Sequence, residues 1–193
     1  MLRSLYDWVI AMANKRYANF ALAGISFTES AFFPIPPDVL LVPMVLANRR
    51  RAFRIAGICT IASVLGGLFG YAIGIWLFQS VGLPLIEFYG SEGKFEKFKE
   101  YYHIWGGWIV AAGGFTPLPY KVITIASGVT KLDLGIFILA SVVSRGLRFY
   151  IIAALLYRYG DSIKGWLEKN LAIFTLLFFV FLVGAFLILK VLI

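Results

Sequence analysis

The chain has 193 residues, of which 61% are hydrophobic and only 15% are charged, and its mean hydropathy is +0.86. Soluble domains carry about 25% charged residues, so this composition excludes a soluble fold and predicts one integral membrane domain over residues 1–193. The formal net charge of +8 does not indicate a nucleic-acid partner, because most of the cations lie between hydrophobic segments, where they set membrane topology.

Three kinds of helical segment alternate along the chain. Segments that mix charged and aromatic residues predict helices in the membrane interface. Apolar segments of about 20 or more residues predict transmembrane helices, and two apolar segments with central prolines predict re-entrant helical hairpins. In chain order, we expect an interfacial helix at 1–16, a hairpin at 17–48, a transmembrane helix at 55–80, an interfacial helix at 91–103, a hairpin at 104–130, a transmembrane helix at 134–157, an interfacial helix at 160–169 and a transmembrane helix at 171–193.

The hairpin predictions rest on segment length and on proline. Residues 17–48 are too many for one simple span and too few for two spans of about 20 residues each. Proline removes a backbone donor and disfavours helical geometry in the preceding residue, so a pair of prolines should stop the helix and let the chain turn back. The expected breaks are Pro34 with Pro36, and Pro117 with Pro119. A kinked span is the alternative.

An internal repeat links the two hairpins. An ungapped shift of 83 residues lays Pro34, Pro36 and Asp38 over Pro117, Pro119 and Lys121, and it lays 55–80 over the later span. With one span between them, the halves must have opposite orientations, as in the inverted repeats of transporters. The expected fold class is therefore an all-α integral membrane protein with an inverted repeat of hairpin plus transmembrane helix.

Topology follows from the distribution of cations. More of them fall on the face that carries Arg50 and Arg54 than on the face that carries Lys97 and Lys99. The positive-inside rule predicts that the richer face is cytoplasmic. Lys121, Arg145 and Arg148 lie on neither face and are left inside the membrane.

Charged residues inside the membrane are the candidate site. Each costs at least about 2.5 kcal/mol at the bilayer centre, so these side chains should face one another or water. Arg145 and Arg148 are three apart on one helix face, where they can meet a phosphate or a carboxylate together. Asp38 and Lys121 hold equivalent hairpin positions with opposite charge and could form an ion pair, whereas Glu29 is the better proton carrier. Alternatively, the charges only hold the fold together.

Other motifs point away from catalysis. Gly66, Gly70 and Gly74 recur on one helix face and predict close helix packing, within one chain or between two copies in a homo-oligomer. The sequence has no histidine and cysteine cluster for a metal, no phosphate-binding glycine loop of the Walker type and no serine and histidine pair placed for nucleophilic catalysis. We therefore expect no enzymatic activity, no metal site and no cofactor.

The motifs together resemble the DedA family, also called SNARE-associated or VTT-domain proteins. The resemblance rests on ESAFFPIPPD at 29–38, on GGLFGYAIG at 66–74 and on the second proline segment, which ends in Ala126 and Gly128. It implies two opposed re-entrant hairpins, essential acids at Glu29 and Asp38, and movement of lipids, with undecaprenyl phosphate as the bacterial substrate and a dependence on the proton gradient. Many members carry arginines beside the second proline turn. This chain has Gly114 and Lys121 there.

The leading functional hypothesis is a transporter or flippase, multi-pass in the bacterial inner membrane, for an anionic phospholipid or a polyprenyl phosphate. Lys121, Arg145 and Arg148 would hold the head group, while Glu29 and Asp38 couple to protons or gate the site. Membrane lipid and protons would be its partners. Two alternatives stay open: a proton-coupled carrier of a small ion or osmolyte, and a scaffold for envelope assembly.

Overall fold

The computed structural model describes residues 17–32, 36–82, 84, 92–116 and 119–160. All regular structure in these ranges is helical, and no strand occurs in them. The all-α prediction is confirmed for this part of the chain. The predicted segments 1–16 and 171–193, and all of 160–169 except Gly160, lie outside it.

The first half contains two short helices and one long one. Proline has a fixed φ and no amide hydrogen, so it suits the start of a helix, and Pro37, at φ −65°, directly precedes α3. Asn48 and the arginines after it form a 3-10 turn that leads into the long helix. The elements are α2 (Ala18–Ala31), α3 (Asp38–Ala47), η1 (Arg49–Arg51), α4 (Ala52–Leu77) and the π-helical turn η2 (Phe78–Gly82).

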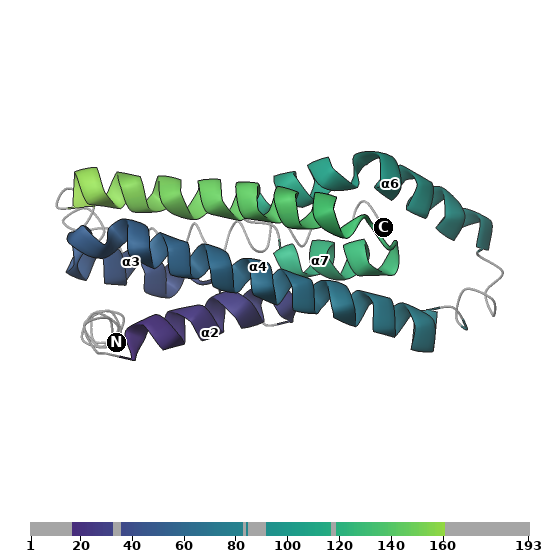
Figure 1. Ribbon diagram of the computed structural model, residues 1–193, viewed down its shortest axis with the longest axis horizontal. Coiled ribbons are helices and arrows are strands. Elements are labelled where there is room, and N and C mark those ends of the chain that lie inside the picture. The colour runs from purple at the N-terminus through teal and green to yellow at the C-terminus, as the bar shows by residue number, and fades with distance from the viewer. Residues whose placement is uncertain (1–16, 33–35, 83, 85–91, 117–118, 161–193) are drawn as a thin grey trace, which may run out of the picture.

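The second half contains one short helix between two long ones. It contains α6 (Glu92–Phe115), α7 (Tyr120–Val129) and a long helix, Leu134–Gly160, which Figure 1 leaves unlabelled. Asp133 begins the long helix, since its Oδ1 accepts a hydrogen bond of 2.9 Å from the amide of Ile136. α6 ends at Phe115 and α7 begins at Tyr120, directly after Pro119.

One boundary differs from the sequence-based expectation. The interfacial segment at 91–103 and the beginning of the second hairpin at 104 are parts of one continuous helix, α6. Gly106 and Gly107 do not interrupt it, because a glycine costs a helix only about 1 kcal/mol, whereas a proline costs about 3. A Cβ atom at either glycine would contact the next part of the chain, at Leu132 or Ile136.

Among the described residues, two helices are long and apolar enough to cross a membrane. They are Arg49–Ser80, of 32 residues, and Leu134–Gly160, of 27 residues. At 1.5 Å per residue, the shorter of the two is about 40 Å long, which exceeds the roughly 30 Å of a hydrocarbon core. The apolar helices α3 and α7 have 10 residues each, so each is about 15 Å long and reaches about half that depth.

The bundle is elongated, and the other helices of the two halves lie toward its opposite ends. In Figure 1, α4 and Leu134–Gly160 run along the long axis, with α2 and α3 toward one end and α6 and α7 toward the other. The end of α2 contacts the start of α7: Thr124 Oγ1 donates to Ser30 O at 3.0 Å in the interior, and Lys121 Nζ lies 3.5 Å from Phe32 O at an exposed position. Each end has its own apolar core: one includes Leu22, Leu41, Cys59 and Phe149, and the other includes Tyr102, Val110, Tyr120 and Phe137.

Candidate functional site

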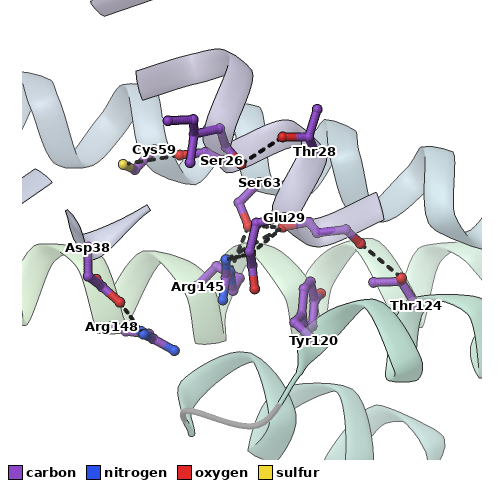
Figure 2. Close-up of polar contacts among 12 residues, drawn as sticks. Ser26, Thr28, Glu29, Asp38, Cys59, Ser63, Tyr120, Thr124, Arg145 and Arg148 are labelled. Atoms are coloured by element: carbon purple, nitrogen blue, oxygen red, sulfur yellow. Dashed lines mark hydrogen bonds and ion pairs between the residues drawn. The ribbon is translucent and has the colours of Figure 1, made fainter. Parts of the chain in front are cut away.

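The predicted charged residues converge halfway along the two long helices. Figure 2 shows Arg145 of Leu134–Gly160 pointing toward Glu29, and Arg148 pointing toward Asp38. Glu29 lies near the end of α2 and Asp38 is the first residue of α3. Both acids are therefore brought to one stretch of one helix, on the two sides of the first proline break.

Arg145 and Glu29 form a buried ion pair within a closed ring of hydrogen bonds. Arg145 Nη2 lies 2.6 Å from Glu29 Oε2, and Arg145 Nε donates to Ser63 Oγ at 2.6 Å. Ser30 closes the ring, because its hydroxyl lies 2.7 Å from Ser63 Oγ and 3.1 Å from Glu29 Oε2. The Arg145 side chain is 1% exposed and that of Glu29 is 12% exposed. This ring of hydrogen bonds thus joins α2, α4 and Leu134–Gly160.

Aromatic rings cover the Arg145 guanidinium. Its Cζ lies 4.9 Å from the ring centroids of both Tyr120 and Phe149, within the range of cation–π attraction. Tyr120 is itself held by a hydrogen bond of 2.5 Å from its hydroxyl to Ser141 Oγ. Arg145 is thereby enclosed by polar partners and by rings, and a guest could not reach it without moving them.

Arg148 and Asp38 form a second, more open pair. Arg148 Nη2 donates to Asp38 Oδ2, and its Nη1 donates to Thr116 O at 3.0 Å. The side chains are 16% and 25% exposed. Asp38 Oδ1 is buried, and no hydrogen-bond partner for it exists among the described residues. Arg148 therefore connects the start of α3 with Thr116, which follows α6.

Lys121 lies beside the same turns but has a different partner from the one expected. Its Nζ approaches the carbonyl oxygen of Phe32 at 3.5 Å, and no ion pair with an acid is found for it in the part of the chain that the structure describes. The expected pair of Asp38 with Lys121 is not formed, and the cation that contacts Asp38, through Oδ2, is Arg148. Lys121 is the cation of the site whose charge no described acid balances.

The glycine face of α4 brings the two halves together. A Cβ atom at Gly66 would overlap the backbone of Phe27 in α2, one at Gly70 would overlap the Thr124 side chain, and one at Gly74 would overlap the backbone of Ile125 in α7. Small residues let helix backbones approach this closely. The same face of α4 thus packs against α2 and α7 on either side of the site.

The proline breaks frame the site from both halves. Pro36 O accepts a hydrogen bond of 3.3 Å from the amide of Val39, and Pro119 O accepts one of 3.0 Å from that of Val122, so each residue precedes a short helix. Pro34 and Pro117 lie outside the described residues.

Four polar residues of the site did not emerge from the sequence. Ser30, Ser63, Tyr120 and Thr124 contribute hydrogen bonds or a ring to the centre. Ser63 had a usable signal, because it lies one turn before Gly66 on the same face of α4. Ser30 had only its position directly after Glu29. In the described ranges no three histidine, cysteine or acidic residues are grouped so as to hold a metal ion.

Comparison with known proteins places the chain in a family. Residues 34–158 match the VTT domain. An uncharacterized protein of Haemophilus influenzae is 36% identical over 187 residues, which cover 97% of each chain. Uncharacterized proteins of Histophilus somni and Methanocaldococcus jannaschii are 33% identical over 168 residues, covering 87% of each chain, and 25% identical over 134 residues, covering 69% of this chain and 81% of that protein. No solved structure matches. With this match over most of its length and its two long apolar helices, the chain belongs to the VTT-domain, or DedA, family of membrane proteins.

Proposed function

We propose that this protein is a multi-pass transporter or flippase of the bacterial inner membrane that moves an anionic phospholipid or a polyprenyl phosphate, such as undecaprenyl phosphate, across the bilayer. The observation that carries the proposal is that the Arg148–Asp38 ion pair and Lys121 lie at the starts of the short helices α3 and α7, beside helices that are long enough to span a membrane. In the proposal, this charged centre lies at mid-membrane depth.

The proposed transport geometry uses the two halves as inverted repeats with re-entrant hairpins. Shifting the bounds of α3 and α4 by 83 residues gives 121–130 and 135–160, each within one residue of α7 and of Leu134–Gly160. The 10-residue helices α3 and α7 can reach the bilayer centre but cannot cross it. A site between two such halves can open to either side in turn.

Energetics favour a working site over a purely structural one. Replacing a buried ion pair by apolar residues is often neutral or stabilising, so two adjacent pairs are a poor way to hold helices together. Ionised side chains inside a membrane are costly and in general mark substrate or ion pathways. A scaffold would need only the glycine packing of α4 and the two apolar cores.

The charge of the site suits an anionic guest. Glu29 and Asp38 balance Arg145 and Arg148, and Lys121 adds one positive charge that no acid among the described residues balances. In the proposal Lys121 and Arg148 bind a phosphate head group, and Arg145 adds positive charge next to them. The lipid tail stays in the bilayer. Proton binding to Asp38 would release Arg148, which is how a proton gradient could be coupled to transport.

A reconstituted assay tests the proposal. Purified protein in vesicles is supplied with fluorescent undecaprenyl phosphate in the outer leaflet, and its movement is followed by quenching from outside. We expect Arg148→Ala and Glu29→Gln to lower the rate at least about tenfold, since a hydrogen bond to a charged group contributes roughly 1.5–3 kcal/mol. Lys97→Gln, an exposed position on α6, is the matched control. Wild-type rates in both site variants would contradict the proposal.

The same vesicles separate lipid transport from carriage of a soluble ion. A proton-coupled carrier of a small ion or osmolyte would change the internal pH when that solute is added to vesicles that contain no labelled lipid. The proposal predicts no such change.

A further inference from the structure

We propose that the two ion pairs of the site have different tasks: Arg145–Glu29 is a fixed brace, whereas Arg148–Asp38 is an exchangeable pair in which a phosphate group displaces the Asp38 carboxylate from Arg148. This inference rests on the proposed function and deepens it, because it names the one arginine that binds the anion. It also makes Asp38 a competitor of the guest.

The first observation is the difference in enclosure. Arg145 is 1% exposed and lies within a ring of hydrogen bonds and beside two aromatic rings. Arg148 and Asp38 are 16% and 25% exposed. A phosphate could reach Arg148 with little rearrangement, whereas reaching Arg145 would require Tyr120 or Phe149 to leave.

The second observation is the difference in hydrogen bonding between the Glu29 and Asp38 carboxylates. Both Ser30 and Arg145 donate to the same oxygen of Glu29. Asp38 accepts from Arg148 through Oδ2, but its Oδ1 is buried without a partner among the described residues. A buried acceptor without a donor is unfavourable, so the closed Arg148–Asp38 pair is less well stabilised than its neighbour.

The third observation is what Arg148 connects. One end of its guanidinium binds Asp38 at the start of α3, and the other binds Thr116 O after α6. Lys121 approaches Phe32 O across the same junction. When a guest replaces Asp38 at Arg148, the link between the start of α3 and the end of α6 is lost. Arg148 and Lys121 then both bind the same anion.

A phosphate group fits this exchange chemically. The guanidinium presents its donors as a rigid fork that matches carboxylate and phosphate oxygens alike. A phosphate oxygen can take the position of Asp38 Oδ2, and a second can accept from Lys121, whose ammonium acts as a point charge. The predicted ligand class is a phosphate monoester, either free in water or on a lipid.

The test is a binding measurement that needs no transport. Purified full-length protein in an uncharged detergent is titrated with dihexanoyl phosphatidate, a short-chain lipid with a phosphate monoester head group, and in a second arm with inorganic phosphate. Asp38→Asn should tighten binding roughly tenfold or more, because removal of a competitor populates the competent state fully and that state is otherwise a minor one. Arg148→Gln should weaken binding more than tenfold.

Three controls make the result specific. Glu29→Gln should not tighten binding, because Arg145 does not exchange partners. Arg158→Gln, an exposed arginine near the end of the same helix, should leave the affinity unchanged. Asp38→Ser repeats the removal of the carboxylate in case the asparagine variant does not fold, and failure of both to fold would overturn the proposal, since Asp38 would then be a brace as well.

The other outcomes are equally clear. Equal tightening by Glu29→Gln and Asp38→Asn, unchanged affinity in Arg148→Gln, or no binding to wild type and to Asp38→Asn would each overturn the exchange. Binding of phosphatidate alone assigns the site to lipid, and binding of both probes assigns it to phosphate in general. If the predicted pattern holds while vesicles show no translocation, the anion site stands and the transport proposal fails. If vesicles show translocation but the predicted binding pattern fails, only the exchange of Asp38 for phosphate is overturned.

Discussion

Substitution of Arg145 by alanine should be among the most destabilising changes in this protein. It leaves the Glu29 carboxylate, 12% exposed, without its cation and removes the hydrogen bond of 2.6 Å to Ser63. Breaking a buried pair by removing one partner costs about 3–5 kcal/mol. Arg148→Ala breaks a pair whose members are 16% and 25% exposed, so solvent screening reduces its cost to roughly 1–3 kcal/mol.

Unfolding in mixed micelles with increasing dodecyl sulfate, followed by circular dichroism, measures both values. Arg145→Met combined with Glu29→Met removes both charges and should recover stability to within about 1–2 kcal/mol of wild type, since apolar replacements of buried pairs are often neutral. The reasoning is refuted if Arg145→Ala costs less than Arg148→Ala, or if the double substitution is no more stable than Arg145→Ala.

Three further predictions address the glycine packing, the aromatic cover of Arg145 and Lys121. Gly66→Ala should destabilise by about 1–3 kcal/mol in the same unfolding assay, because its Cβ overlaps the backbone of α2. Gly24→Ala, with no atom within 4 Å, should be neutral or stabilising by up to about 1 kcal/mol, and equal losses at the two sites would contradict the packing. Tyr120→Phe should cost about 1 kcal/mol through its lost hydroxyl bond while keeping the ring over the arginine, and a loss of 3 kcal/mol or more, about three times this value, would show that the hydroxyl does more. Lys121→Gln should slow lipid translocation at least about tenfold relative to Lys97→Gln, and equal rates would exclude Lys121 from the head-group site.

The sequence located the charged centre because ionised residues are rare in apolar segments and proline has one dominant effect on a helix. The sequence predicts that the charged side chains face one another or water. Four of them form two ion pairs, Glu29 with Arg145 and Asp38 with Arg148, whereas Lys121 approaches a backbone carbonyl. Their pairing was not predictable, since it depends on where Leu134–Gly160 passes the end of α2 and the start of α3. The repeat related Asp38 to Lys121, but equivalence in two halves does not imply contact.

The serine, threonine and tyrosine residues around the ion pairs were harder to predict for a different reason. Serine, threonine and tyrosine are ordinary residues in membrane helices, and nothing in their type separates Ser63 from other serines. Only the closed ring of hydrogen bonds gives Ser30 and Ser63 their role. The continuity of α6 was likewise missed, because a change from charged to apolar composition at residue 104 is no physical reason for a helix to end.

The central claim, that the two proline breaks meet at the bilayer centre, is tested most directly by the depth of spin labels. Phe32→Cys and Thr116→Cys leave intact the backbone carbonyls that bind Lys121 and Arg148, and the native Cys59 is buried. Collision rates with oxygen and with a water-soluble nickel complex should place both labels near the bilayer midplane, with labels at Arg50→Cys and Lys97→Cys at opposite surfaces. A label from either break at the membrane surface, or both reference labels on one side, would contradict the account.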